Sequence, residues 1–396
     1  MKKNNIVKII ISIVFVAFLF CVFFMNSPFA EITELYDYVT SYNSDETQES
    51  IEEIETAYSD SMNIRDKLIN MNGRMAKLLH MRGMFKDMGM YVTDDYYIVS
   101  ASKYTSTDYE YEQTTALKNY LDEKGITLIY VNKPVKYLDD TMLTDNFGVE
   151  SYSNRNADLL LSRLREAGVN TIDIRENITK DNMDIKDLFY RTDHHMTTKA
   201  GLYVTKIIAE GLNEYSGYSI DTSMFDLDNF RTKEWKECWL GEQGNKFALS
   251  YVGLDDFTEI KPDYETKYSF WNLDGDKWTG SFDTFVNEGF YDTTADVYEA
   301  NSWHYSYANH NAINENVDYG KVLMLGDSYD CVIQPFLSLG IHETDFLLMR
   351  GLDDSFNLRE FIDKNGYDTV IIGYAQFMIG AHDDPDSDNY RMFKFD

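Results

Sequence analysis

Strand-like and helix-like stretches alternate along two parts of the chain, residues 96–215 and residues 321–374. Short apolar runs bounded by Gly, Pro or polar residues indicate buried strands, and longer amphipathic stretches indicate helices. The predicted strands are 96–102, 126–132, 171–174, 321–325, 345–349 and 368–374, and the predicted helices are 116–125, 156–168, 197–215, 329–340 and 355–366. This alternation is typical of an α/β domain whose parallel sheet has helices on both faces.

The alternation stops between about residue 220 and residue 318, where Tyr, Trp, Asp and Gly are frequent. Short apolar runs such as 247–253 look like strands. We interpret this region as an irregular, β-containing insertion packed beside the sheet of one α/β domain, residues 86–396. Residues 31–85 precede that domain, begin with an acidic stretch and show helical spacing of apolar residues, which predicts a helical stalk.

The N-terminus carries a pattern of its own. Lys2, Lys3 and Lys8 precede an apolar run at 9–25 in which Ser12 is the polar residue. This length and the flanking positive charge predict a signal anchor within residues 1–30, with the N-terminus in the cytosol and the α/β domain outside. Cleavage among the small residues near 26–30 is the alternative, and it would release a secreted protein.

The amino-acid composition excludes some classes of function. The chain has 67 Asp and Glu against 36 Lys and Arg, a net charge of −31. A nucleic-acid binder needs a basic surface, so no nucleic-acid partner is expected. The hydrophobic fraction of 44% is ordinary and permits a sizeable core. Cys238 and Cys331 could form one disulfide, but they make no framework and no zinc motif.

Two short motifs carry candidate chemistry. Gly326-Asp327-Ser328 follows a predicted strand and precedes a predicted helix, which places Ser328 at the carboxyl edge of the sheet. A serine hydroxyl becomes a nucleophile when an imidazole takes its proton and an acid orients the imidazole. Asp193 and His195, on a loop that we expect to end another strand–helix unit, have the spacing to supply both. Each motif alone also fits a simple helix cap.

Together these motifs resemble the DHHW family, which is related to the SGNH hydrolase-like domain of AlgX- and AlgJ-type alginate O-acetyltransferases. The residues that carry the resemblance are Asp193-His194-His195-Met196-Thr197, Gly-Asp-Ser at 326–328, Pro335-Phe336, Trp239-Leu240-Gly241 and Asp255-Asp256. The likeness spans roughly residues 60–375. It implies an SGNH-like, flavodoxin-like three-layer α/β/α domain with a permuted motif order, because the acid and histidine precede the serine here.

The resemblance implies a role for each site residue. Ser328 is expected as the nucleophile, His195 as the base and Asp193 as the group that orients it. The candidate donors to the oxyanion are the backbone N–H of Ser328 or Tyr329 and the side chains of Arg350 and Lys136. His194 is expected to point elsewhere and to contact the second substrate. Met196 replaces the tryptophan that names the family.

The predicted function is an extracytoplasmic O-acetyltransferase that modifies a cell-surface polysaccharide or exopolysaccharide without a cofactor. Because acetyl-coenzyme A stays inside the cell, the resemblance implies a membrane-bound O-acyltransferase partner that supplies the acetyl group. The alternatives are a carbohydrate esterase with the same triad, a non-catalytic glycan-binding surface protein, and a metal site at Asp193, His194 and His195 with His304 or His310. Trp271, Trp278 and Trp303 are either sugar-stacking residues or ordinary core.

Overall fold

A computed structural model describes most of the catalytic region. The described residues are 65–83, 85–286, 305, 308–353, 355–380 and 387–395. The chain divides into two units, Met1–Met81 and Arg82–Asp396, and the described part of the first unit contains helix α4 (Arg65–Leu78). The predicted signal anchor and most of the predicted stalk lie outside the described residues. Within the described ranges, no helix combines the length and the apolar character needed to cross a membrane.

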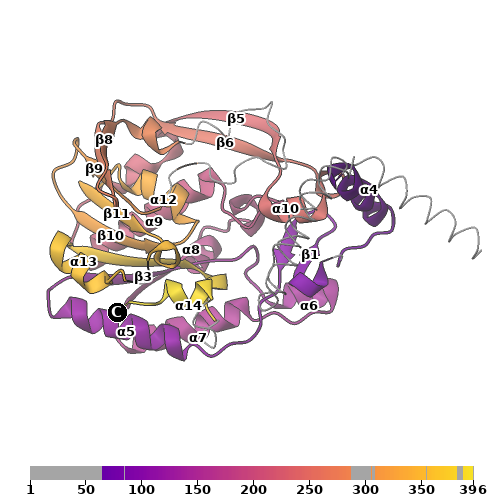
Figure 1. The fold of residues 1–396 in the computed structure, drawn as a ribbon, viewed down its shortest axis with the longest axis horizontal. Coiled ribbons are helices and arrows are strands. Elements are labelled where there is room, and N and C mark those ends of the chain that lie inside the picture. Colours follow the sequence, from indigo (N-terminus) through magenta and orange to yellow (C-terminus); the bar gives the residue numbers. More distant parts are fainter. Residues whose placement is uncertain are drawn as a thin grey trace, which may run out of the picture. The chain divides into compact units, whose positions relative to one another are not determined.

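The described part of the second unit forms an eight-stranded sheet with the order β4-β3-β12-β10-β11-β9-β7-β8 (Figure 1). The strands are β3 (Thr127–Lys133), β4 (Asn170–Asp173), β7 (Tyr268–Asn272), β8 (Lys277–Gly280), β9 (His310–Asn314), β10 (Lys321–Gly326), β11 (Glu343–Leu347) and β12 (Thr369–Ala375). The strands from β4 to β11 in this order are parallel, and β9, β7 and β8 continue the sheet antiparallel.

The parallel strands have a permuted flavodoxin-like order. If counting begins at β10 and continues through β11 and β12 to β3 and β4, the spatial order reads 2-1-3-4-5, the flavodoxin-like arrangement. In that arrangement ligands bind outside the carboxyl ends of the strands where the order reverses, which here is between β10 and β12. The predicted permutation thus places the end of β10, and with it Ser328, at the ligand-binding edge.

Helices cover both faces of the parallel strands, because successive side chains alternate between two hydrophobic cores. Leu128 and Tyr130 of β3 face one core, whereas Ile129 and Val131 face the other. The first core is closed by α5 (Asp108–Asp122), α7 (Ser153–Glu166), α13 (Leu358–Asn365) and α14 (Asp388–Met392), and the second by α8 (Ile174–Lys180), α9 (Thr198–Tyr215) and α12 (Asp330–Leu337). Figure 1 shows α5 and α7 along one side of the sheet.

Two closely packed helices bring the motifs together. Helix α9 begins where Thr197 accepts a hydrogen bond from the Ala200 N–H at 3.2 Å, a standard N-cap. A side chain at Gly201 of α9 would approach Val332 of α12 to 2.7 Å, so only glycine permits this distance between the helices. Helix α9 follows the Asp193–His195 segment, and α12 follows Ser328.

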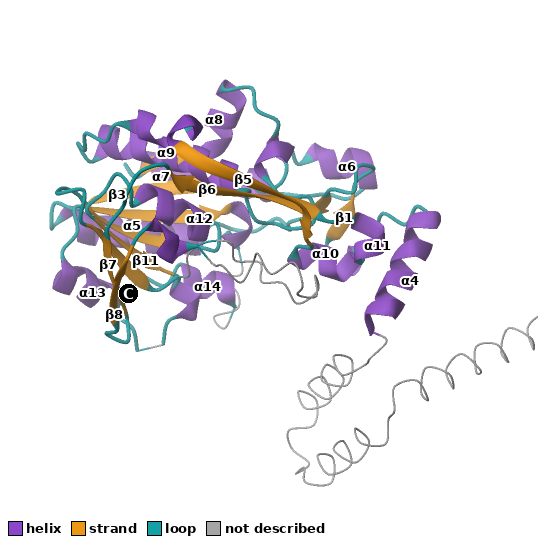
Figure 2. Ribbon diagram, turned by 90° about the horizontal axis from the view of Figure 1, so that it is seen from above, coloured by secondary structure: helices purple, strands orange, loops and turns teal. Residues whose placement is uncertain are grey.

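The region 220–318 differs from the prediction. Strands β7, β8 and β9 join the main sheet beyond β11, whereas the sequence predicted that this region packs beside the sheet. They provide backbone partners for the edge of β11, which would otherwise be exposed. A separate antiparallel pair, β5 (Phe230–Trp239) and β6 (Asp255–Pro262), is visible in Figure 2. The apolar run at 247–253 is not a strand, because it contains the end of α10 and the whole of α11, two short helices separated by Ala248 with φ +84°. Phe247 and Tyr251 are both buried.

Most of the remaining predicted elements occur within a few residues of their expected positions, but α5 begins at Asp108 and not at the predicted residue 116. One predicted strand has a different place. The strand predicted at 96–102 is β2 (Ile98–Ser100), and it pairs with β1 (Met90–Val92) in a small separate sheet. Besides α8 and α14, the short helices that were not predicted include α6 (Thr141–Phe147), α10 (Glu242–Phe247) and α11 (Leu249–Val252). Cys238 and Cys331 are both free thiols, so the disulfide considered from the sequence is absent.

Candidate active site

Asp193 and His195 form a hydrogen-bonded acid–imidazole pair. The Nδ1 atom of His195 lies 2.5 Å from Asp193 Oδ1, and the His195 backbone N–H donates to the same oxygen at 2.8 Å. The other oxygen of Asp193 accepts from the Glu242 backbone N–H at 2.6 Å. This arrangement fixes the ring with Nδ1 as the donor, and therefore leaves Nε2 as the nitrogen able to accept a proton.

The charge of Asp193 is stabilised inside the protein. The side chain is fully buried, and burial by itself would raise the pKa of its carboxyl group. The interaction with His195 and the hydrogen bonds that Asp193 accepts outweigh burial and hold its pKa well below the ordinary range. Asp193 is therefore an anion at neutral pH and stabilises a positive charge that develops on His195.

The loop that carries this pair does not directly follow a strand, contrary to the prediction. It lies between a 3₁₀ turn, η2 (Ile185–Leu188), and helix α9. Asp255 holds it from β6, because its carboxylate accepts from the Arg191 N–H at 3.0 Å and the Thr192 N–H at 2.7 Å. The Gly241 N–H donates to the Thr192 hydroxyl at 2.9 Å. The Trp-Leu-Gly and Asp-Asp motifs noted in the sequence thus position the acid.

We expect Gly241→Ala to reduce both stability and activity. A Cβ at this position would lie 2.3 Å from the Asp193 Cβ and 2.7 Å from the Thr192 carbonyl oxygen, both on a packed loop. Overpacking of this kind costs about 1–3 kcal/mol, and a displacement of roughly 1 Å in a catalytic group lowers the rate by about 10²-fold. Urea denaturation and esterase assays measure the two effects. Gly83→Ala is the control, because its Cβ meets Tyr91 at 3.8 Å; equal behaviour of the two variants would contradict the prediction.

Lys136 supports the same loop and does not act as a free oxyanion donor. Its buried ammonium donates to the Asp193 carbonyl at 2.8 Å and to the Arg191 carbonyl at 3.1 Å. The ammonium also lies 4.1 Å from the centre of the Tyr97 ring. The donors of Lys136 are thus directed at the backbone on both sides of Thr192, which corrects the role considered from the sequence.

Lys136 gives the folded protein a distinct pH dependence. Burial lowers its pKa to about 7, whereas an unfolded lysine titrates near 10.4. Between these values the unfolded chain binds the extra proton, so the contribution of Lys136 to the free energy of unfolding rises with pH. Neutral Lys136 still has two N–H groups for its two carbonyl partners.

We therefore expect the free energy of unfolding of wild type to rise by on the order of 1–2 kcal/mol relative to that of Lys136→Met when the pH rises from 7 to 9. Urea denaturation at the two pH values measures the difference. Lys206→Met is the control, because Lys206 pairs with Asp226 on the surface and should show no such gain. A constant difference between wild type and Lys136→Met would contradict the depressed pKa.

Ser328 lies on the turn between β10 and α12, at the carboxyl edge of the sheet, and is 6% exposed. The Tyr329 N–H donates to Asp327 Oδ1 at 2.9 Å. That N–H is thus engaged within the turn, which corrects its proposed role as an oxyanion donor. Arg350 lies in the 3₁₀ turn η7 (Met349–Gly351) beyond β11, and its side chain is half-buried.

Tyr329 connects the serine turn with the acid–base loop. Its hydroxyl donates to the His194 carbonyl at 2.7 Å, and its ring centre lies 6.0 Å from that of His195. The prediction that His194 points elsewhere is wrong, because its ring lies against that of His195, with centres 3.9 Å apart and planes tilted by 36°, and meets Phe377 edge-on at 5.6 Å. Burial lowers the pKa of His194 to about 3, so this imidazole is neutral.

The same residues were considered as a metal site. Asp193, His194 and His195 offer ligand atoms within 4.8 Å of one another. Both oxygens of Asp193, however, already accept hydrogen bonds from the protein. His310 packs its ring near Phe270 and Phe285 and is not in this group, and His304 lies outside the described residues. The geometry therefore fits an acid–base pair better than a metal site.

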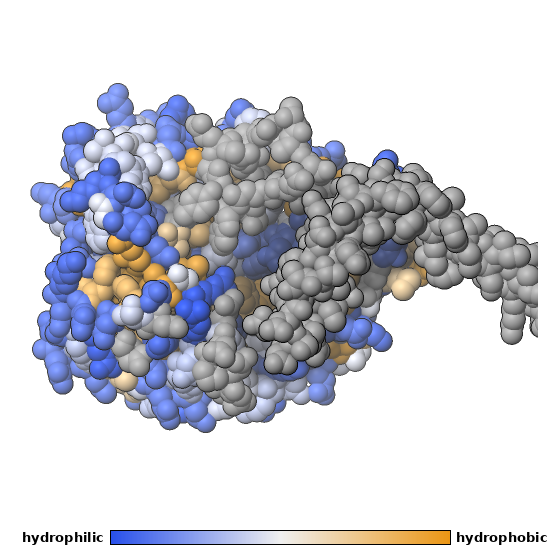
Figure 3. All heavy atoms as spheres, viewed as in Figure 1, coloured by the Kyte–Doolittle hydropathy of each residue, from blue (hydrophilic) through white to orange (hydrophobic). Residues whose placement is uncertain are grey.

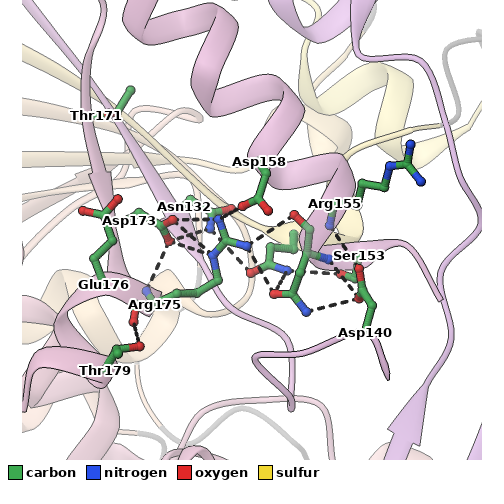
Figure 4. Close-up of polar contacts among 12 residues, drawn as sticks. Asn132, Asp140, Ser153, Arg155, Asp158, Thr171, Asp173, Arg175, Glu176 and Thr179 are labelled. Atoms are coloured by element: carbon green, nitrogen blue, oxygen red, sulfur yellow. Dashed lines mark hydrogen bonds and ion pairs between the residues drawn. The ribbon is translucent and has the colours of Figure 1, made fainter. Parts of the chain in front are cut away.

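A second polar cluster lies at the carboxyl ends of the neighbouring strands β3 and β4 (Figure 4). Arg175 forms hydrogen bonds with both oxygens of Asp173, and it also donates to Asn154 and Asp158 of α7. Asn132, next to Lys133 on β3, donates to Asp173 at 3.0 Å. Because the guanidinium donors are used within the protein, we interpret this cluster as a structural link between strand ends and α7.

Two of the tryptophans considered for sugar stacking, Trp271 and Trp278, lie on β7 and β8 at the end of the sheet. Trp278 is 37% exposed and stacks on Phe270 with ring centres 5.5 Å apart, and Trp271 lies near Phe361. These contacts are those of an ordinary sheet surface, and Trp303 lies outside the described residues. On the face shown in Figure 3, hydrophilic residues surround a smaller area of hydrophobic ones, as the acidic composition leads one to expect.

Fold and site together define an SGNH-like α/β domain with a serine at one strand end and an acid–histidine pair beside it. Residues 86–235 match the family model described as "SGNH hydrolase-like domain, acetyltransferase AlgX". This match includes Asp193 and His195 and ends before Ser328. The family resemblance predicted from the sequence is thus confirmed, and it indicates an enzyme. A search of curated proteins gives no sequence match for the chain.

Solved structures support the same fold. PatB1 of Bacillus cereus superposes with a TM-score of 0.60 at 18% identity, over 77% of this chain and 99% of that one. A second structure of PatB1, described with a sulfonyl adduct, superposes with a TM-score of 0.59 over 97% of its chain. A DHHW family protein from Eubacterium siraeum DSM 15702 gives 0.56 at 18% identity, over 77% and 95% of the two chains. At this identity the likeness establishes the fold.

Proposed function

We propose that this protein is an extracytoplasmic O-acetyltransferase that transfers acetyl groups to a polysaccharide through an acetyl-serine at Ser328. The observation that carries the proposal is the buried Asp193–His195 hydrogen bond beside the turn that bears Ser328. The match of residues 86–235 to an acetyltransferase family model supports the same reaction class.

The chemistry proceeds in two half-reactions. His195 Nε2 removes the Ser328 hydroxyl proton while Oγ attacks the acetyl carbonyl of the donor, and Asp193 stabilises the resulting imidazolium. The imidazolium then protonates the leaving group of the donor, which leaves an acetyl ester on Ser328. In the second half, His195 deprotonates a sugar hydroxyl that attacks this ester, and the proton returns to Ser328. Water in place of the sugar gives the esterase reaction.

The cellular setting is part of the proposal. The apolar segment at 9–25 and its flanking lysines support a membrane anchor with the catalytic domain outside the cytosol. Acetyl-coenzyme A is then on the other side of the membrane, so a membrane-bound O-acyltransferase has to deliver the acetyl group. Alternatively, cleavage of the segment would give a secreted enzyme with the same chemistry.

The test uses full-length protein in detergent with 4-nitrophenyl acetate as the donor. We expect a burst of nitrophenol, a mass increase of one acetyl group on the peptide that contains Ser328, and transfer of this group to added oligosaccharides. Mass spectrometry of the protein and of the sugar measures both steps, with and without EDTA.

The outcomes separate the candidate functions. Loss of the acetyl group to sugar supports the transferase, and loss to water at an unchanged rate with sugar present supports the esterase. Acylation that disappears with EDTA supports a metal enzyme. Absence of acylation at Ser328 in any condition would leave a glycan-binding protein as the better interpretation.

A further inference from the structure

A buried ion cluster lies directly beneath the Ser328 turn. Lys133, at the end of β3, is fully buried, and its ammonium contacts Asp327 Oδ1 at 2.9 Å and Asp330 Oδ2 at 2.5 Å. These two acids are the residues on either side of the Ser328–Tyr329 pair. Strand β12 lies between β3 and β10, so the lysine reaches across a whole strand to bind the turn.

The backbone makes room for this cluster. A Cβ at Gly326 would lie 2.4 Å from Asp330 Oδ2, and one at Gly373 of β12 would lie 3.3 Å from Asp330 Oδ1. The glycine of the Gly-Asp-Ser motif is thus needed for the space that the Asp330 carboxylate occupies. Both glycines lie on strands that pair with each other in register.

The acids in turn fix the backbone around the serine. Asp327 accepts from the Tyr329 N–H at 2.9 Å and from the Ala375 N–H of β12 at 2.6 Å. Asp330 accepts from the Asp327 N–H at 2.9 Å. Burial by itself would lower the pKa of Lys133, but the two carboxylates raise it above its ordinary value, so the ammonium is charged.

Lys133 also contacts the residue that connects the two halves of the site. Its ammonium lies 5.6 Å from the centre of the Tyr329 ring, and the Tyr329 hydroxyl donates to the His194 carbonyl. We propose that Lys133 is a positioning residue that sets Ser328 against His195 by holding Asp327, Asp330 and Tyr329 at once. The inference rests on the proposed function, because it concerns the reactivity of Ser328.

The test compares the rate at which a sulfonyl fluoride modifies Ser328 in full-length variants. Lys133→Met leaves two buried carboxylates without a cation beside them and can fail to fold. The double variant Lys133→Met/Asp330→Asn removes the ammonium together with one of its two carboxylate partners, so only Asp327 loses a cation. We expect it to be folded, as judged by circular dichroism and thermal unfolding, and to react about 10²-fold more slowly.

Two further variants complete the design. Asp330→Asn keeps Lys133 paired with Asp327, so its rate of modification should fall less, by about 3- to 10-fold. Lys206→Met removes a surface lysine and should react like wild type. A folded double variant and an Asp330→Asn variant that both react at the wild-type rate would show that Lys133 is only structural. A wild-type Ser328 that does not react at all would overturn the proposed function and this role with it.

Discussion

Replacement of Ser328 by alanine is expected to abolish acylation, with a loss in kcat/KM on the order of 10⁵-fold toward 4-nitrophenyl acetate. In the proposed mechanism the Ser328 hydroxyl is the atom that becomes acetylated, so the variant lacks the nucleophile. The turn itself should be unchanged, because the bonds that hold it come from Asp327 and Asp330 and not from the serine side chain. We therefore expect an unchanged melting temperature together with the loss of activity.

The measurement combines burst kinetics with peptide mass spectrometry. Ser223→Ala is the matched control, because Ser223 is exposed and its hydroxyl bonds only locally to Asp221. Acetylation of the Ser328 peptide in wild type and in the control, but not in Ser328→Ala, would establish the nucleophile. Full activity in Ser328→Ala would remove the serine mechanism from consideration.

Replacement of Asp193 by asparagine is expected to lower kcat by about 10⁴-fold with a smaller change in KM. One carboxylate oxygen accepts from His195 Nδ1 and from the His195 backbone N–H, and the other accepts from the Glu242 N–H. Asparagine has a single amide oxygen, which can accept either from His195 or from the Glu242 N–H. If it serves Glu242, the amide NH₂ faces Nδ1 and forces the proton onto Nε2, where it blocks proton transfer from Ser328.

The opposite amide orientation turns the NH₂ group toward the Glu242 N–H, so the variant should also lose some stability, about 1–3 kcal/mol. Steady-state kinetics and urea denaturation separate the two effects. Asp226→Asn is a surface control that should preserve kcat and the free energy of unfolding, since Asp226 is exposed and its partner Lys206 is partly exposed. A kcat within a few-fold of wild type in Asp193→Asn would contradict the role of Asp193 in selecting the tautomer.

The sequence alone was sufficient for the alternating elements of the parallel sheet. Strands such as β3, β10 and β12 are short apolar runs between polar or glycine residues, and both of their faces are buried, so their local pattern is distinct. The motifs Asp-x-His and Gly-Asp-Ser, together with their order along the chain, also predicted an acid–histidine pair and a serine at the sheet edge. The spacing of Asp193 and His195 allowed their contact because both lie on one short loop.

The tertiary structure decided what depends on contacts between distant segments. The run at 247–253 is helical and β7–β9 join the sheet, because pairing with β11 and burial of one helical face outweigh local preference. The positions of Lys136 and Lys133 illustrate the same principle. Both lysines end up buried, one against loop carbonyls and one between two acids, and only packing determines which groups surround a buried charge.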